Sequence, residues 1–242
     1  MRDSWWGGQF GLDWGKGSDG SGWGLGVTGG YVSQEGKVKA SGDRIKIDGG
    51  NVGLYARYRS ADGFFAHALA KLDRYSIKYD FGNGAAAPKT NGTSYGVEVE
   101  AGYHIRSGAV FFEPSASASW SDADLDGFSG AQSGVGARFD HVQSFYGRAG
   151  LRAGVETKAG GWTLQPYVGA NWEGEMNGRP EATLSSGGEN LLFRDASEGG
   201  RARFEAGIQG SSQGLSAFAK VDGVTGSGTS GIAARAGVSV RW

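Results

Sequence analysis

The chain has 242 residues, a formal net charge of −1, 47 glycines and no cysteine. The near-neutral charge gives no basic footprint for nucleic acid, and the lack of cysteine excludes a disulfide framework and a thiolate metal site. No run of about 18 apolar residues occurs, which excludes a transmembrane helix, and the aromatic residues spread along the chain argue against disorder.

Apolar and polar residues alternate with a period of two in many segments, which is the pattern of strands with one apolar face. The segment 95–105 is the clearest, because Tyr95, Val97 and Val99 alternate with Glu98 and Glu100. From the N-terminus onward the pattern predicts strands at residues 6–14, 23–31, 51–59, 64–79, 95–105, 110–120, 145–156, 162–173, 202–208, 215–221 and 232–242.

The connections between these strands alternate between two lengths. Short ones rich in Gly, Asp and Ser favour tight turns, as at residues 61–63, 106–108, 159–161 and 211–214. Long ones lie between them, at residues 34–47, 81–92, 122–139, 177–200 and 223–231. Strict alternation of short turns and long loops is typical of outer-membrane barrels, and aromatic residues at the strand ends would form the two interfacial girdles.

We therefore predict one all-β domain over residues 1–242, a transmembrane antiparallel up-and-down β-barrel of the outer-membrane type. A mean hydropathy of −0.37 agrees with this fold class, because only alternate residues of a barrel strand face lipid. Bacterial barrels of one chain have even strand counts, so we expect about 12 strands, with the first upstream of Trp5. Residues 1–6 contain no apolar core of a signal peptide, so we expect any export signal upstream as well.

The final strand alternates to the last residue. Ala236, Val238, Val240 and Trp242 share one face, whereas Arg241 and its alternate neighbours form the other. An unpaired terminal strand of this kind invites aggregation in a soluble domain, but a closed barrel pairs it and gives its apolar face to lipid.

Charged residues gather on the other parity of the strands, and both signs are present. We predict that they line a hydrophilic lumen, because Arg or Lys facing lipid at the bilayer midplane costs about 2–4 kcal/mol. An open alternative is that they serve only the charge pairing that any barrel interior requires. The predicted lumen-lining residues are Arg57, Arg59, Glu98, Glu100, Glu113, Arg148, Arg152, Glu156, Glu173, Arg203, Glu205, Arg235 and Arg241, together with Lys71, Lys220 and Asp222.

Several stretches resemble the C-terminal translocator domain of classical autotransporters, the type V secretion pathway of Gram-negative bacteria. They lie at residues 52–58, 95–103, 112–114, 147–154 and 161–167. The resemblance implies a twelve-stranded barrel in the bacterial outer membrane, a plug helix in its lumen and a passenger domain upstream. No segment of helical period precedes Trp5, so we expect the plug helix and the first strand to lie upstream of this sequence.

The resemblance also implies the partners. Residues 237–242 are similar to the signal that the barrel-assembly machinery recognises, which assigns Gly237, Val240 and Trp242 to assembly. The expected partners are thus outer-membrane lipid, the barrel-assembly machinery, periplasmic chaperones, and the chain's own passenger and plug helix. The alternative reading of Val240 and Trp242 is ordinary contact with lipid.

Enzyme chemistry finds little support in the sequence. His67, His104 and His141 lack metal-ligand spacing, and no cofactor motif is present. Asp140 and His141 form the only local acid–histidine pair, and a solvated loop is the simpler explanation for them. Three functions stay open: a translocator, a freestanding pore or adhesin-like barrel without a passenger, and an outer-membrane barrel hydrolase.

Overall fold

The computed structural model describes residues 2–18, 21–37, 44–80, 89–129, 135–139, 142–177, 181–186, 189–194, 199–226 and 229–240. Every regular element in this part of the chain is a β-strand. These residues form no helix that is long and apolar enough to cross a membrane.

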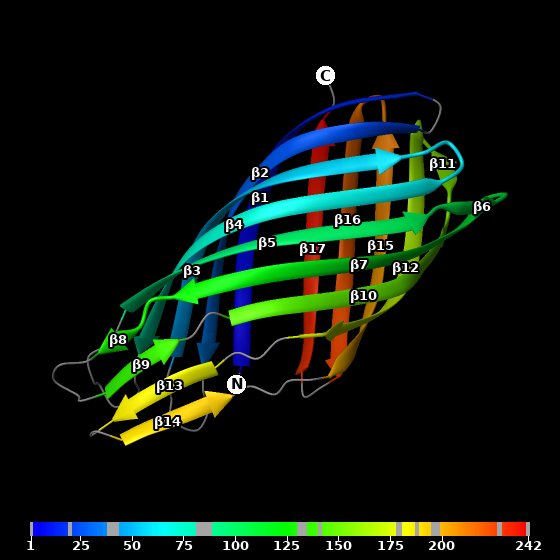
Figure 1. Cartoon of the computed structure of the whole chain (residues 1–242). Coiled ribbons are helices and arrows are strands. Elements are labelled where there is room, and N and C mark those ends of the chain that lie inside the picture. Colours follow the sequence, from blue (N-terminus) through cyan, green and yellow to red (C-terminus); the bar gives the residue numbers. More distant parts are fainter. Residues whose placement is uncertain are drawn as a thin grey trace.

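Eleven long antiparallel strands form the main sheet, and each pairs with its neighbours in chain order (Figure 1). All eleven predicted strands are present, and most are longer than predicted. Their bounds are β1 (Arg2–Ser18), β2 (Ser21–Lys37), β3 (Arg44–Arg59), β4 (Phe64–Asp80), β5 (Lys89–Tyr103), β7 (Val110–Leu125), β10 (Val142–Val155), β12 (Trp162–Glu175), β15 (Gly200–Ser212), β16 (Leu215–Gly226) and β17 (Thr229–Val240).

Two short strands lengthen hairpins of this sheet and bring it to 13 strands, namely β6 (Ile105–Ser107) beside β7 and β11 (Thr157–Ala159) beside β12. A second sheet has four strands in the order β14–β13–β9–β8. It consists of β8 (Phe128–Ser129), β9 (Val135–Phe139), β13 (Glu181–Ser186) and β14 (Glu189–Arg194). These strands occupy segments that we predicted to be long loops. The alternation of residues along the sequence did not reveal them, because β9 pairs with β13, which lies far along the chain.

The predicted loop at 34–47 is shorter in the structure, because β2 and β3 both extend into it. Beyond Tyr31 and Val52 the two faces of β2 and β3 exchange polarity, so the apolar residues Ile45 and Ile47 fall on the opposite parity. The alternation continues, but its phase is reversed, and the sequence prediction ended the strands there. The predicted loop at 223–231 is likewise a narrow hairpin, since Gly226 already pairs with Thr229.

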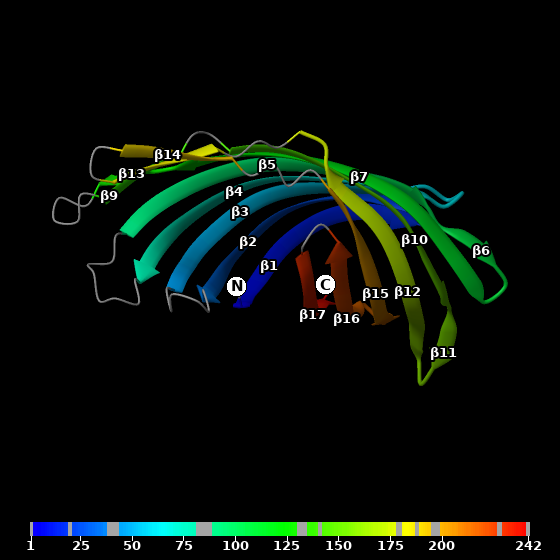
Figure 2. The ribbon, with the colours of Figure 1, turned by 90° about the horizontal axis from the view of Figure 1, so that it is seen from below.

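The sheet curves strongly around a hollow, and the strands are tilted (Figures 1 and 2). The short turns and the end of β17 lie at one end of the molecule, which we call the short-turn end. The ends of β2 and β4, the four-stranded sheet and the start of β1 lie at the other end, which we call the long-loop end (Figure 1). The edge strands β1 and β17 run in the same direction and share no ladder within the described residues.

The two edges nevertheless approach each other, because the Arg235 guanidinium carbon lies 5.9 Å from the centre of the Trp5 ring. The structure is therefore a barrel with an open seam between β1 and β17. The twelfth strand expected upstream stays a prediction.

The distribution of apolar side chains is the inverse of that in a soluble domain. Among the described residues only Ile77, Phe111 and Tyr167 are buried apolar side chains, whereas Phe10 is 76% and Leu54 63% exposed on the outer face. Large contiguous apolar surfaces of this kind mark contact with a membrane or a partner. The outer face carries an apolar belt.

Aromatic residues mark both borders of this apolar belt. Trp6 and Trp14 in β1, Trp23 and Tyr31 in β2, and Tyr95 and Tyr103 in β5 lie eight positions apart on the outer face: 14 − 6, 31 − 23 and 103 − 95. A tilted strand needs about 9–11 residues to cross a bilayer. The belt therefore matches the thickness of a membrane, and β2 to β5 continue well beyond it at the long-loop end.

Candidate functional site

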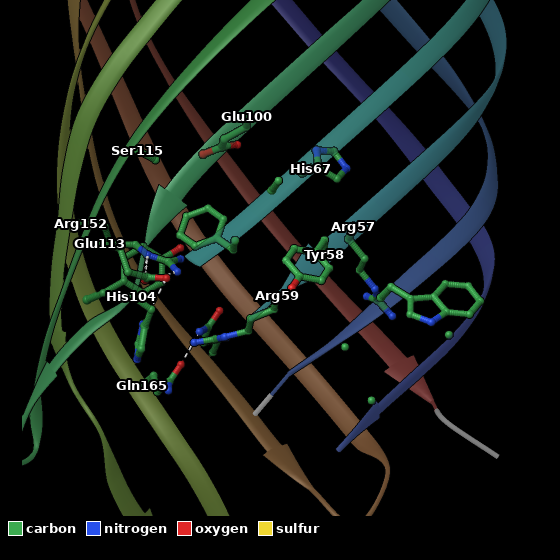
Figure 3. A pocket seen from close by; sticks show the side chains of 18 of the residues that line it. Arg57, Tyr58, Arg59, His67, Glu100, His104, Glu113, Ser115, Arg152 and Gln165 are labelled. Atoms are coloured by element: carbon green, nitrogen blue, oxygen red, sulfur yellow. Dashed lines mark hydrogen bonds and ion pairs between the residues drawn. The ribbon is translucent and has the colours of Figure 1, made fainter. Parts of the chain in front are cut away.

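The inner face of the sheet encloses a cavity of about 1290 Å³. Its walls carry side chains from nearly every long strand, and the close-up in Figure 3 shows several of them directed into the same space. Ten of the predicted lumen residues line it: Arg57, Arg59, Glu100, Glu113, Arg148, Arg152, Arg203, Glu205, Lys220 and Arg235. Glu98, Glu156 and Glu173 join the same face through ion pairs, and Arg241 lies outside the described residues.

The most extensive charge network joins β12, β15, β16 and β17. Arg201 Nε lies 2.8 Å and Arg203 Nη2 lies 3.0 Å from Oε1 of Glu173. Arg203 also reaches Asp222 at 2.7 Å, and Asp222 in turn lies 2.5 Å from Arg235. The two carboxylates have side chains only 3% and 2% exposed, so the three arginines compensate negative charge that water hardly reaches.

A second network lies nearer the short-turn end. Arg152 Nε donates to Glu113 Oε2 at 2.7 Å, and the Arg152 guanidinium carbon lies 4.6 Å from the centre of the Tyr167 ring. His104 Nδ1 lies 3.3 Å from Glu113 Oε1, and its ring stacks on Phe111 (Figure 3). Glu113 is 9% exposed, so these groups fix a buried carboxylate between β5, β7 and β10.

Smaller pairs complete the inner wall. Arg148 bridges Glu98 at 3.6 Å and Glu100 at 3.3 Å. Lys220 pairs with Glu205 at 3.0 Å. The other inner pairs are Lys71 with Asp73, Arg57 with Asp13, and Arg106 with Glu156.

This arrangement makes the cavity polar without a large net field. Acidic and basic groups neutralise each other locally, and amides such as Gln165 and Gln209, which hydrogen-bond each other, add neutral donors and acceptors. Arg59 points into the cavity and has no ion-pair partner within the described part of the chain (Figure 3). Such a wall can hydrogen-bond a polar chain of either charge.

Sequence reasoning missed three members of these networks, Asp13, Arg106 and Arg201. Asp13 lies between Leu12 and Trp14 in β1, so its inward parity was available from the alternation. Arg106 belongs to β6, which was predicted as a turn, and Arg201 lies just before the predicted start of its strand. Both were missed because the strand ends carry a weak pattern.

The residues assigned to assembly lie on the last strand. Val240 is 58% exposed on the outer face and pairs with Leu215. Gly237 faces inward beneath the Phe218 ring, where a Cβ would lie 2.5 Å from Phe218 Cε1. Gly237 thus has a structural reason to be glycine, independent of recognition. Trp242 lies outside the described residues.

One turn at the short-turn end carries a resolved electrostatic effect outside the strands. In the β3–β4 turn the Ser60 hydroxyl donates to the Asp62 carboxylate, and this hydrogen bond holds the pKa of Asp62 below its usual value. Gly63 has φ +101°, and its carbonyl accepts a hydrogen bond of 2.8 Å from the His104 amide. The turn is thereby tied to the end of β5.

The described residues offer little for catalysis. No group of three His, Asp or Glu among them could hold a metal ion. His104 contacts Glu113 and Phe111, and His67 lies near the Tyr55 ring. The Asp140–His141 pair lies outside the described residues.

Comparison with known proteins then decides the family. The model of the family described as "Autotransporter beta-domain" matches residues 1–222. The chain belongs to this family.

Two curated autotransporters are similar in sequence. BrkA of Bordetella pertussis (strain Tohama I) is 28% identical over 210 residues, which is 83% of this chain and 20% of BrkA. The probable autotransporter YcgV of Escherichia coli K12 is 28% identical over 153 residues, 59% of this chain and 16% of YcgV.

Solved autotransporter structures share the fold. The beta domain of Bordetella BrkA superposes with a TM-score of 0.81 at 22% identity, covering 99% of this chain and 91% of that one. The transport unit of AIDA-I from Escherichia coli gives 0.86 at 20% identity, with 99% and 83% coverage. The translocator domain of NalP from Neisseria meningitidis gives 0.72 at 16% identity, with 99% and 81% coverage.

The resemblance inferred from the sequence is therefore confirmed, and so is the fold class. This autotransporter beta-domain spans about a fifth of BrkA and less of YcgV. The cavity and its charge networks lie within a β-sheet of the autotransporter beta-domain fold.

Proposed function

We propose that this domain is an outer-membrane translocator, which anchors an N-terminal passenger domain of its parent protein and helps to export it to the cell surface. The observation that carries the proposal is the pairing of an apolar outer belt of membrane thickness with a polar, charge-balanced cavity in a member of the autotransporter beta-domain family. The belt matches a bilayer, and the cavity provides a wet path across it.

The inner wall suits this task in two ways. Its carboxylates already pair with arginines of the wall. A chain that passes through the cavity therefore meets few unpaired charges that could bind it tightly. The networks also link neighbouring strands, which keeps the wall open against collapse. After export, the same polar wall would hold a plug helix, with Arg59 as a cation that has no described ionic partner.

The final strand would direct assembly. We propose that Gly237, Val240 and Trp242 form the signal that the barrel-assembly machinery recognises after periplasmic chaperones deliver the chain. Val240 faces outward, as a surface for recognition requires. Gly237 would act through the close packing of Phe218, and Arg241 would extend the inner parity of the strand.

The test uses the whole parent protein expressed in Gram-negative cells. We expect protease added to intact cells to remove the passenger, and the domain to fractionate with the outer membrane as a heat-modifiable band. Replacement of Trp242 by Glu should abolish this band. The matched control is Trp14→Glu, which introduces the same charge at a tryptophan on the outer face of β1. Equal band yields from the two variants would contradict a special role of the last residue.

A freestanding pore is the second candidate, because the cavity of about 1290 Å³ could conduct ions. The upstream reading frame separates the two functions. A signal peptide followed by a long exported region supports the translocator, whereas a signal peptide close to Met1 supports a pore or adhesin-like barrel. Hydrolase activity finds no support in the described residues.

A further inference from the structure

Beyond the apolar belt, the outer face of β3, β4 and β5 becomes basic. At the long-loop end this face presents Arg74, Lys78 and Lys89, all exposed, on the same parity as Leu72 and Tyr95 of the belt. The inner parity of this region is apolar, as Ile47 and the buried Ile77 show. The charges therefore point outward and away from the cavity.

The lysines are arranged in register. Lys46 of β3 pairs directly with Lys78 of β4, and Lys78 pairs directly with Lys89 of β5. Side chains opposite each other on adjacent strands have Cβ atoms about 4.5–5.5 Å apart, and like charges at such positions repel. An unbroken row of three lysines across three strands is thus unfavourable unless an anion lies between them.

The neighbouring acids compensate only part of this charge. Asp48 lies 3.2 Å from Lys46, and Glu35 lies 3.9 Å from Arg44. No carboxylate within the described residues pairs with Arg74, Lys78 or Lys89. Asp80 shares the outer parity two residues beyond Lys78 but forms no described ion pair with it. The patch therefore keeps at least these three uncompensated cations.

The patch lies at a defined height on the barrel. Arg74 pairs with Gly50, which pairs with Tyr31, an aromatic residue of the belt border. Lys78 is four residues further along β4, about 13 Å beyond that border along the strand. The polar head-group region of a bilayer begins where its hydrocarbon core ends, so the patch lies on the head-group side of the belt.

Directly below the patch the apolar belt is hollowed. A groove of about 750 Å³ crosses the outer face of β1 to β5. Small residues such as Gly29 and Ala70 lie along it, and Phe10, Leu54 and Tyr95 stand around them. Leu72 lines the groove and is two residues from Arg74 on the same face of β4, so the apolar groove leads directly to the cationic patch.

We propose that Arg74, Lys78 and Lys89, together with the groove below them, bind a phosphorylated lipid with several acyl chains from the leaflet at the long-loop end. The phosphates would lie between the cations, and the acyl chains would fill the groove. A basic cluster next to an apolar membrane surface is the arrangement that recognises anionic lipid head groups. A soluble anion would use the cations alone, and an acidic peptide would have no use for an apolar groove inside the bilayer.

This proposal rests on the membrane location proposed above, and its test keeps the two separate. The whole protein is purified from membranes in detergent and titrated with diphosphorylated, hexa-acylated lipid A, with bound lipid counted by native mass spectrometry. The variant carries Lys78→Gln and Lys89→Gln. The matched control carries Lys16→Gln and Lys158→Gln, which remove the same charge from exposed positions near the short-turn end.

We expect the Lys78/Lys89 variant to bind lipid A about 30-fold more weakly, since each surface cation contributes roughly fivefold. The control pair should bind as the unchanged protein does. Ala70→Trp, which fills the groove, should weaken binding of lipid A. Any competition by inorganic phosphate should be the same in this variant as in the unchanged protein. Dephosphorylated lipid A should bind weakly to every variant.

Three outcomes would overturn the proposal. The first is binding by the Lys78/Lys89 variant within threefold of the unchanged protein. The second is an equal loss in both lysine pairs, which would indicate a general effect of net charge. The third is competition by millimolar inorganic phosphate together with no effect of Ala70→Trp, which would indicate an anion site alone. Outer-membrane fractionation of the same variants tests the location independently.

Discussion

Arg203 connects two carboxylates that water hardly reaches, and its removal tests the central charge network. Its guanidinium lies 3.0 Å from Glu173 and 2.7 Å from Asp222, which are 3% and 2% exposed. Removing one partner of a buried ion pair costs about 3–5 kcal/mol. Arg201 and Arg235 still contact the two acids, and Arg203 itself faces a wet cavity, so we expect Arg203→Met to cost about 2–3 kcal/mol.

The assay is reversible urea unfolding of the lipid-reconstituted domain, followed by tryptophan fluorescence. With a slope of about 2–3 kcal/mol per molar urea, the midpoint should fall by roughly 1 M. Arg203→Lys should lie in between, because an ammonium cannot reach both acids with a rigid fork. Arg59→Met is the matched control, since it removes an inner arginine that has no ionic partner within the described residues, and it should shift the midpoint little.

A double-mutant cycle with Asp222→Asn separates pairing from packing. If the network acts as a unit, the two single losses will not add, and the coupling free energy will be about 1 kcal/mol or more. An Arg203→Met variant that unfolds within about 0.5 kcal/mol of the unchanged protein, or that cannot be distinguished from Arg59→Met, would refute this role of Arg203.

Three further perturbations test other parts of the fold. Leu54→Arg, at midbelt on the outer face, should cost about 2–4 kcal/mol in lipid unfolding assays, whereas Ser115→Arg, on the wall of the cavity, should cost far less; equal costs would invert our assignment of faces. Gly63→Ala should lower the unfolding free energy by about 1–3 kcal/mol, because φ is +101° and a Cβ would collide with the His104 carbonyl oxygen, and an unchanged urea midpoint would disprove this strain. Asp62 should titrate below the ordinary aspartate value in carbon-detected NMR and move back in Ser60→Ala; since its folded pKa is depressed, its contribution to the turn is present at neutral pH and lost as the pH falls through that lowered value.

The alternation of residues was sufficient to predict much of the fold. Within the apolar belt each strand keeps one parity for lipid and one for the cavity, so Tyr95, Val97 and Val99 could be assigned to the outer face and Glu98 and Glu100 to the inner one. Parity likewise indicated that Glu113 and Arg152 would share the inner face. A period of two is a local property of a strand and survives in a single sequence.

The partners of those charges were decided only in three dimensions. Arg203 contacts Glu173 and Asp222 across strand neighbours whose register no single strand encodes, and Asp13 meets Arg57 from a different hairpin. The four-stranded sheet at the long-loop end was invisible for the same reason, since β9 and β13 are brought together by the barrel.

Beyond Tyr31 the apolar and polar faces of β2 exchange sides, and this exchange shows most directly where sequence pattern and tertiary structure differ. The sequence alone determined a barrel with an apolar outer face and a charged interior, because lipid outside and water inside impose opposite demands on alternate residues. Only the tertiary structure decided how far β2 to β5 project past the belt, and that Lys46, Lys78 and Lys89 lie in one row. Register across strands, rather than alternation along one strand, brings distant charges together.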